Sequence, residues 1–221
     1  SDLALPIDET VMSSFCPGLA KAGSSAVTST TAAFFSAGLT PGGSARPQAG
    51  GADRLLDFIA REVQPRVAEA FAVDRQRQTI SGHSFGGLCV LHALFTRPAL
   101  FTRYAATSPS VWWNQGQVLQ TAAQFMQAHA TAPRAFSARL QLRVGSLEHA
   151  QTAATPARAA VQAERRLLER TEALAQQLTA LQWPALHVQM AVLPGLDHGS
   201  VRRPGLADAL ALAQQVILWE V

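Results

Sequence analysis

The sequence of 221 residues contains only two cysteines, Cys16 and Cys89, and a single lysine, Lys21. Two cysteines cannot build a disulfide framework or a thiolate-rich metal site, so neither is expected and no metal is predicted. No stretch reaches the roughly 20 consecutive apolar residues that cross a bilayer, so no membrane span is expected. Because there is a single lysine, arginine supplies nearly all the positive charge, and the net charge is +3.

The basic residues do not gather in any run that alternates with aromatic residues, which is the pattern of a nucleic-acid surface. We therefore expect no nucleic-acid partner. The N-terminus shows no basic segment followed by an apolar core, although a secretory signal that has been removed leaves no trace. The compartment and the oligomeric state are left open by the sequence.

Length and composition favour one domain, because 221 residues, 48% of them hydrophobic, are enough for one buried core and few for two. Residues 1–52 are rich in alanine, serine, threonine, glycine and proline and show no sustained helical or strand period. From Asp53 the pattern changes to regular elements. We therefore expect an atypical N-terminal segment, 1–52, and a folded core, 53–221.

The core alternates between predicted strands and predicted helices. Helices are expected over 53–71 (with a cap at Asp53 and a kink at Pro65), 86–95, 156–182 and 206–219. Strands are expected over 79–82, 104–107, 140–144 and 186–193. This alternation is typical of the α/β class, with a mostly parallel sheet that carries helices on both faces.

The segment 81–87, Ser-Gly-His-Ser-Phe-Gly-Gly, lies between a predicted strand and an apolar helix. A serine with glycine two positions before and after it, at such a junction, is the pattern of a nucleophile elbow in the α/β-hydrolase fold. Ser84 is therefore the candidate nucleophile. The backbone N–H of Phe85 is the candidate oxyanion donor, because the helix dipole favours negative charge there.

A serine hydroxyl needs a base to take its proton, and in this fold the base is a histidine after a late strand. His198 lies in the segment 193–200, directly after the last predicted strand, so it is the candidate base. His149 is the rival, but it precedes that strand.

The acid that orients the histidine should follow the preceding strand, which selects Glu148. Asp197 is the competitor, although a residue adjacent to His198 cannot easily turn its carboxylate onto that ring. A serine–histidine dyad without a fixed acid is a further alternative.

Three segments, 82–88, 106–113 and 195–201, carry a family resemblance. With them, the chain from Asp53 onward resembles the enterobactin and salmochelin esterases, bacterial siderophore hydrolases of the esterase D group. The resemblance implies an α/β-hydrolase fold, a serine esterase that uses no cofactor, and a small-molecule ester substrate such as a ferric siderophore. It also implies a bacterial cytoplasmic or periplasmic protein.

In similar proteins the stretch Ser-Pro-Ser-aliphatic-Trp-Trp follows the strand beside the elbow and lines the mouth of the active site. The resemblance thus places Ser108, Trp112 and Trp113 near the substrate, and we add His83, beside the nucleophile, as a substrate contact. Indole faces suit flat aromatic acyl groups such as catechols. Ordinary packing under a loop is the alternative for the tryptophans.

The family also has several strands before the helix that precedes the elbow, and one of their loops supplies a second oxyanion donor. Residues 1–52 show neither feature. Either those strands are missing, or the segment folds in a way that its pattern does not reveal.

The leading hypothesis is a serine esterase that hydrolyses the ester bonds of a catecholate trilactone siderophore or a similar aryl ester. A general carboxylesterase or acyltransferase of the same group is the first alternative, because the elbow and histidine specify acyl chemistry and not the acyl acceptor. A non-catalytic protein that binds a ligand or partner is the second alternative.

Overall fold

In the computed structural model, residues 51–74, 76–132 and 136–214 are described. Their strands form one parallel sheet in the order β1-β2-β3-β4, which confirms the predicted α/β class and the parallel sheet. The strands are β1 (Thr79–His83), β2 (Arg103–Thr107), β3 (Ala138–Gly145) and β4 (Leu186–Leu193).

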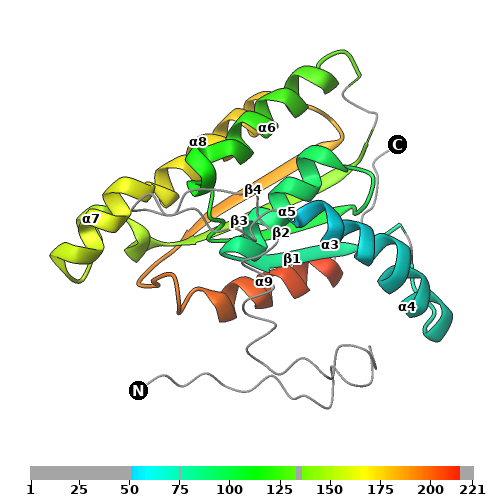
Figure 1. The fold of residues 1–221 in the computed structure, drawn as a ribbon, viewed down its shortest axis with the longest axis horizontal. Coiled ribbons are helices and arrows are strands. Elements are labelled where there is room, and N and C mark those ends of the chain that lie inside the picture. Colours follow the sequence, from blue (N-terminus) through cyan, green and yellow to red (C-terminus); the bar gives the residue numbers. More distant parts are fainter. Residues whose placement is uncertain (1–50, 75, 133–135, 215–221) are drawn as a thin grey trace.

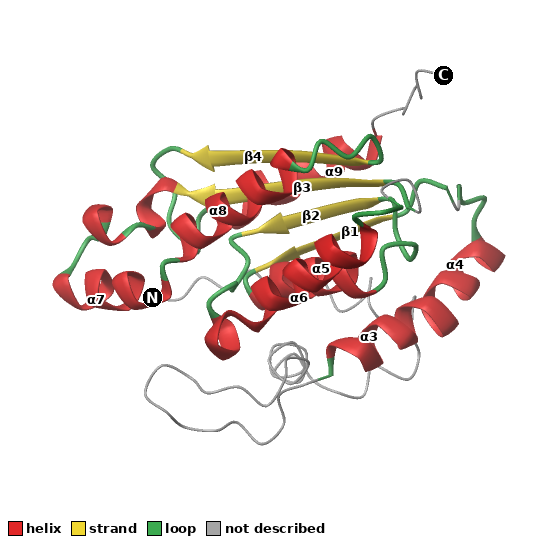
Figure 2. Ribbon diagram, turned by 90° about the horizontal axis from the view of Figure 1, so that it is seen from above, coloured by secondary structure: helices red, strands yellow, loops and turns green. Residues whose placement is uncertain are grey.

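Helices cover both faces of this sheet, as Figures 1 and 2 show. One face carries α5 (Phe85–Thr96), α6 (Trp113–His129) and α8 (Leu167–Ala180), and the other face carries α9 (Arg202–Gln214). The apolar residues of α5 explain its central place, because Leu91 and Leu94 have no exposed surface and pack in the same cluster as Leu140 and Leu142 of β3.

The helix predicted over 53–71 is present as α3 (Ala52–Phe58), a π-helical turn (Ile59–Val63) and α4 (Gln64–Ala70). The change in winding comes just before Pro65, which lies inside this continuous run of helical residues, and its missing N–H removes one bond of the helix there. The predicted cap is wrong. α3 has no side-chain cap, and the carboxylate of Asp53 instead lies 3.0 Å from Nε2 of His92.

The single long helix predicted over 156–182 is also wrong. The structure has two helices, α7 (Pro156–Arg165) and α8, and between them Arg166 takes a left-handed conformation with φ of +48°. The apolar stripe that suggested one helix lies on α8 alone, since α7 has no buried residue. No glycine or proline marks the break, so the helical pattern runs straight through it.

The remaining predicted strands and the helix after the elbow agree with the structure within a few residues. The predicted closing helix begins four residues earlier than expected, at Arg202, and its last part lies outside the described residues. The N-terminal segment predicted over 1–52 also lies outside the described residues, except for residues 51 and 52. None of the described helices combines the length and apolar character that crossing a membrane requires.

The parallel sheet determines where a site can form. Because all four strands run in one direction, the loops that follow them leave from the same edge of the sheet. The register aligns the ends of neighbouring strands, with His83 opposite Thr107 and Gly145 opposite Leu193. The elbow after β1, the segment after β2 and the loops after β3 and β4 therefore converge there.

Candidate active site

The nucleophile elbow has the strained backbone that its pattern predicts. Ser84 has φ of +59° and ψ of −117°, a conformation that non-glycine residues rarely adopt and that costs about 1–3 kcal/mol. Hydrogen bonds on both sides hold it there. The amide of Ser84 donates to the carbonyl of Thr107 at 3.0 Å, and its carbonyl accepts from the amide of Ser110 at 3.1 Å.

The glycines around Ser84 do not share one role. A Cβ atom at Gly82 would lie 2.3 Å from the backbone of Gly86, and a Cβ at Gly87 would lie 3.0 Å from the carbonyl oxygen of Thr107. A Cβ at Gly86 would meet nothing within 4 Å. The close approach of strand and helix thus requires the absence of a side chain at Gly82. A side chain would be crowded at Gly87, whereas Gly86 leaves room for one.

Three residues predicted from the sequence lie in one hydrogen-bonded series. Oγ of Ser84 lies 2.9 Å from Nε2 of His198, and Nδ1 of His198 lies 2.6 Å from Oε2 of Glu148. An ionised carboxylate only accepts, so Nδ1 carries the proton, and Nε2 is left to accept the proton of Ser84. This is the arrangement that an acyl-transfer triad needs.

The carboxylate of Glu148 is buried, with 4% of the residue exposed, and its second oxygen is also held. Oε1 accepts hydrogen bonds from the amide of Gly145, at 2.9 Å, and from the hydroxyl of Ser108. Ser108 has no exposed surface. The structure therefore places Ser108 behind the acid, which differs from the expectation that it lines the mouth of the site.

The two rival residues point elsewhere. Oδ1 of Asp197 accepts from the amides of Gly199 and Ser200, within its own loop. His149 faces Glu169 through Nε2, at 3.3 Å, and does not bind Ser84. Neither contact supports the roles that these residues would have had as acid or base.

His83 packs on the candidate base, with its ring centroid 4.6 Å from that of His198. Its Nε2–H donates to the backbone carbonyl of His198 at 2.8 Å. This nitrogen of His83, which was predicted to contact substrate, is therefore bound to the loop that carries His198. Burial, with the nearby charge of His198 as the second cause, lowers the pKa of His83 to about 4. His83 is therefore neutral near pH 7 and supports the position of His198.

The two tryptophans are packed more closely than a stacking platform would be. Trp113 is 4% exposed, and Phe85 meets it edge to face at 4.8 Å between ring centroids. Trp112 is partly exposed, but the guanidinium carbon of Arg165 lies 4.2 Å from the centroid of its ring. Packing thus accounts for Trp113, and only Trp112 offers indole surface at this edge, with one face covered.

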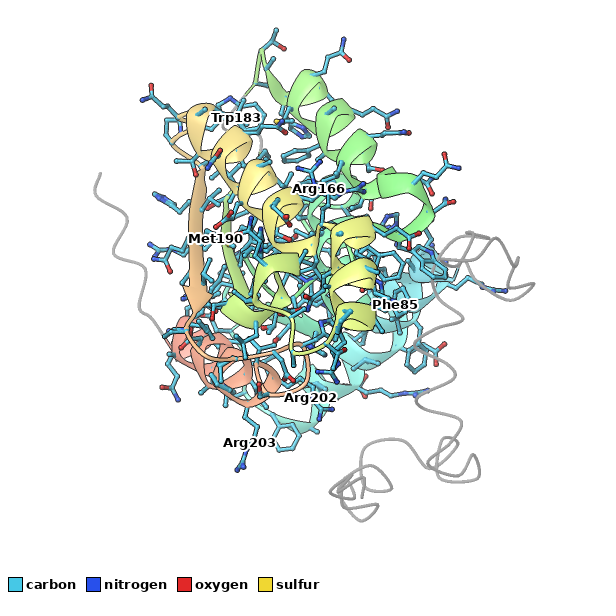
Figure 3. The ribbon with its side chains drawn as sticks, turned by 90° about the vertical axis from the view of Figure 1, so that its left-hand side faces the viewer. Phe85, Arg166, Trp183, Met190, Arg202 and Arg203 are labelled. Atoms are coloured by element: carbon cyan, nitrogen blue, oxygen red, sulfur yellow. The ribbon has the colours of Figure 1, made fainter. Side chains whose placement is uncertain are left out.

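The loop after β4 is held at its far end by α9. Nε of Arg202 donates to the carbonyl of Gly199 at 3.0 Å, while the neighbouring Arg203 extends away from the ribbon in Figure 3. Glycine at position 145 allows the same loop to approach β3, since a Cβ there would lie 2.2 Å from the carbonyl oxygen of Leu196. Gly145 was not predicted as part of the site, although its place directly after the predicted strand 140–144 was a signal.

Ser110 is a second residue that the sequence analysis missed. Its hydroxyl oxygen lies 3.3 Å from Oγ of Ser84, and the residue is 1% exposed. It belongs to the Ser-Pro-Ser stretch that was singled out for other reasons.

Phe85 is the first residue of α5, and helix geometry directs its N–H out of the helix end, beside Ser84. The segment 1–52, in which the sequence showed no loop for a second oxyanion donor, lies outside the described residues up to residue 50.

No group of three or more histidine, cysteine, aspartate or glutamate side chains in the described ranges could hold a metal ion. Cys89 is buried in α5, and burial raises the pKa of its thiol to about 11.

Comparison with known families agrees with this geometry. The family described as "Putative esterase" matches residues 35–190, which is more than half of the chain. The chain belongs to this esterase family. Its curated relatives include siderophore esterases, as the resemblance implied, but they come from fungi as well as from bacteria.

A siderophore enterobactin esterase from Emericella nidulans is 38% identical over 184 residues, which is 77% of this chain and 59% of the relative. The ferri-bacillibactin esterase of Bacillus subtilis is 41% identical over 86 residues, 39% of this chain and 30% of the relative. The structure resembles a siderophore hydrolase from Aspergillus nidulans with a TM-score of 0.69 and 34% identity, over 79% of this chain and 61% of that one. The esterase chain thus spans about 60% of the length of these two longer matches.

Proposed function

We propose that this esterase-family chain is a serine esterase that hydrolyses the ester bonds of siderophores, without a cofactor. The observation that carries the proposal is the hydrogen-bonded series from Ser84 through His198 to Glu148, at the end of a strained elbow. The activities for which the related esterases are named support the siderophore as substrate class.

The geometry supplies each step of an ester hydrolysis. Oγ of Ser84 attacks the ester carbonyl carbon while its proton passes to Nε2 of His198, and the N–H of Phe85 faces the developing oxyanion. Collapse of this intermediate breaks the bond to the alcohol, which leaves with the proton from Nε2. Water then attacks the acyl-serine in the same way, with His198 as base, and releases the acid and the free serine.

Within this class we propose a catecholate trilactone or a similar aryl ester as the substrate, with Trp112 at the mouth of the site. A general carboxylesterase is the second candidate. It is favoured by the burial of Trp113 and by the cover of Arg165 on Trp112, because both leave less indole surface for an aromatic acyl group.

The test is the hydrolysis of three esters by the purified chain, followed by mass spectrometry of the products. The esters are a catecholate trilactone, a simple catechol monoester and a butyrate ester, and Ser84→Ala is the control. Cleavage of the trilactone with the highest kcat/KM supports the siderophore proposal. A preference for butyrate supports the general carboxylesterase, and no cleavage of any ester by the parent contradicts both.

A further inference from the structure

The segment after β2 places one buried hydroxyl directly behind the candidate acid. Ser108 has φ of +43° and no exposed surface, and its hydroxyl donates to Oε1 of Glu148. The next residue is Pro109, and a residue before proline is restricted to extended conformations. A serine before proline disfavours the left-handed backbone, and a polar hydroxyl disfavours burial. Both features of Ser108 therefore need support from the surrounding structure.

Surrounding hydrogen bonds hold Ser108 in this conformation. Its own amide donates to the carbonyl of Arg143 in β3 at 2.6 Å, and the preceding residue, Thr107, accepts from the amide of Ser84 at 3.0 Å. On the other side, the amide of Ser110 donates to the carbonyl of Ser84. The segment is thus fastened both to the elbow and to the strand that carries the acid.

The consequence lies in how the carboxylate is oriented. A carboxylate oxygen only accepts hydrogen bonds, so the Ser108 hydroxyl and the Gly145 amide are two donors fixed on Oε1. With Oε1 held, Oε2 is directed at Nδ1 of His198, at 2.6 Å. The titratable side chains that face this carboxylate are His198 and, beside it, His83.

We propose that Ser108 is a positioning residue, whose strained backbone places its hydroxyl so that the carboxylate of Glu148 stays aimed at His198. This proposal rests on the esterase function proposed above. The strain at Ser108 is then maintained for the position of its hydroxyl, because an unstrained backbone would carry the hydroxyl away from Oε1.

The experiment separates the hydroxyl from the strain. Ser108→Ala and Ser108→Gly both remove the hydroxyl, but only glycine adopts a left-handed backbone without strain. We expect Ser108→Gly to unfold at a higher temperature than Ser108→Ala. Both variants should lose kcat about 10-fold to 100-fold, which is the usual effect of one hydrogen bond to a charged group, while KM stays near that of the parent.

Two readouts report on the carboxylate itself. The acid limb of the pH profile of kcat/KM should move to higher pH in both variants, because the ionised acid has lost a donor. The proton resonance of the Nδ1–H of His198, which a short bond to a carboxylate shifts far downfield, should move or broaden in the protein without substrate. Thr171→Val is the control, since Thr171 is a buried residue on α8 whose hydroxyl donates to the carbonyl of Leu167. It should alter neither readout.

A folded Ser108→Gly that keeps the parent's kcat, acid limb and downfield resonance would overturn the proposal. Activity that is retained by glycine and lost by alanine would also overturn it, since the backbone alone would then matter. If the parent cleaves no ester, the esterase proposal fails, but the downfield resonance still decides whether Ser108 positions Glu148.

Discussion

Oδ1 of Asp197 lies 2.8 Å from both the backbone nitrogen and the hydroxyl oxygen of Ser200. These hydrogen bonds, above all the one from the amide, hold the pKa of Asp197 below its ordinary value. The carboxylate closes its own loop and leaves the neighbouring His198 ring to Glu148. The adjacent acid therefore shapes the loop that carries the histidine.

Exchange of each acid for its amide should separate these roles. Glu148→Gln should lower kcat by about 100-fold or more, because an amide cannot stabilise the charged imidazole. Asp197→Asn should keep most of kcat and lower the unfolding temperature. Steady-state kinetics and thermal unfolding of both variants are the measurements.

The stability that Asp197 contributes has a defined pH dependence. A lowered pKa in the folded state adds stability above the unfolded pKa, near 3.9, and this stability is lost as pH falls through the folded value. The difference between parent and Asp197→Asn should therefore shrink below about pH 4. A larger loss of turnover in Asp197→Asn than in Glu148→Gln would contradict the assignment of the acid.

Ser84→Ala and His198→Ala should each abolish measurable ester hydrolysis while circular dichroism shows an unchanged fold. Members of a triad act as a unit, so the double variant should be no slower than either single variant. The rate of labelling by a fluorophosphonate provides a second readout, in which Ser84→Ala takes no label and His198→Ala reacts slowly. A double variant far slower than both single variants would mean that His198 is not the base for Ser84.

The elbow glycines should respond differently to alanine. Gly82→Ala places a Cβ 2.3 Å from backbone atoms of Gly86, so the protein should unfold at a much lower temperature or fail to accumulate. Gly86→Ala meets no atom within 4 Å and should fold like the parent, with a gain of up to about 1 kcal/mol from helix propensity. Thermal unfolding compares them. Equal losses at both positions would show that the strand and helix are not packed as described.

His83 should stay neutral from pH 8 down to about pH 5, since its pKa is about 4. NMR titration should show its ring signals constant from pH 8 to pH 5. His83→Gln, which can still donate to the carbonyl of His198, should keep the acid limb of the activity profile.

The lowered pKa of His83 also makes its contribution to the stability of the fold depend on pH. Unfolded His83 binds a proton near pH 6.5 and folded His83 does not until about pH 4, so its contribution to stability is full above pH 6.5 and falls as pH drops toward 4. The unfolding temperature of the parent should therefore decline more steeply than that of His83→Gln in this window. An equal decline in both proteins would assign the titration to another group.

The tryptophans should separate into a packing residue and a surface residue. Trp113→Ala should destabilise the fold by about 3–5 kcal/mol, because Trp113 is buried against Phe85. Trp112→Ala should fold and should reduce the preference for a catechol ester over a butyrate ester about 2-fold to 13-fold, which is the value of one aromatic contact. The ratio of the two kcat/KM values is the measurement, and an unchanged ratio would remove Trp112 from the substrate site.

Sequence patterns were sufficient to predict the strands and the three candidate catalytic residues. The hydrophobic period of a strand and the order of residues along the chain are both present in the sequence itself. The break at Arg166 was not predictable in this way, since an arginine in a left-handed conformation leaves no mark in a helical pattern. The position of Ser108 was misread for a related reason. Its hydroxyl is directed by bonds to β3 and to the elbow, which come from distant parts of the chain.

Every described strand supplies part of the candidate site at its carboxyl end: Ser84 after β1, Ser108 and Ser110 after β2, Glu148 after β3 and His198 after β4. Adjacent residues in a strand are about 3.3 Å apart and point to opposite faces. A slip of one residue in β1, β3 or β4 would therefore break contacts of 2.6–2.9 Å in the series, and a slip in β2 would displace Ser108 from Glu148. An assay of the proposed ester hydrolysis would therefore also test whether the four described strands are correctly paired.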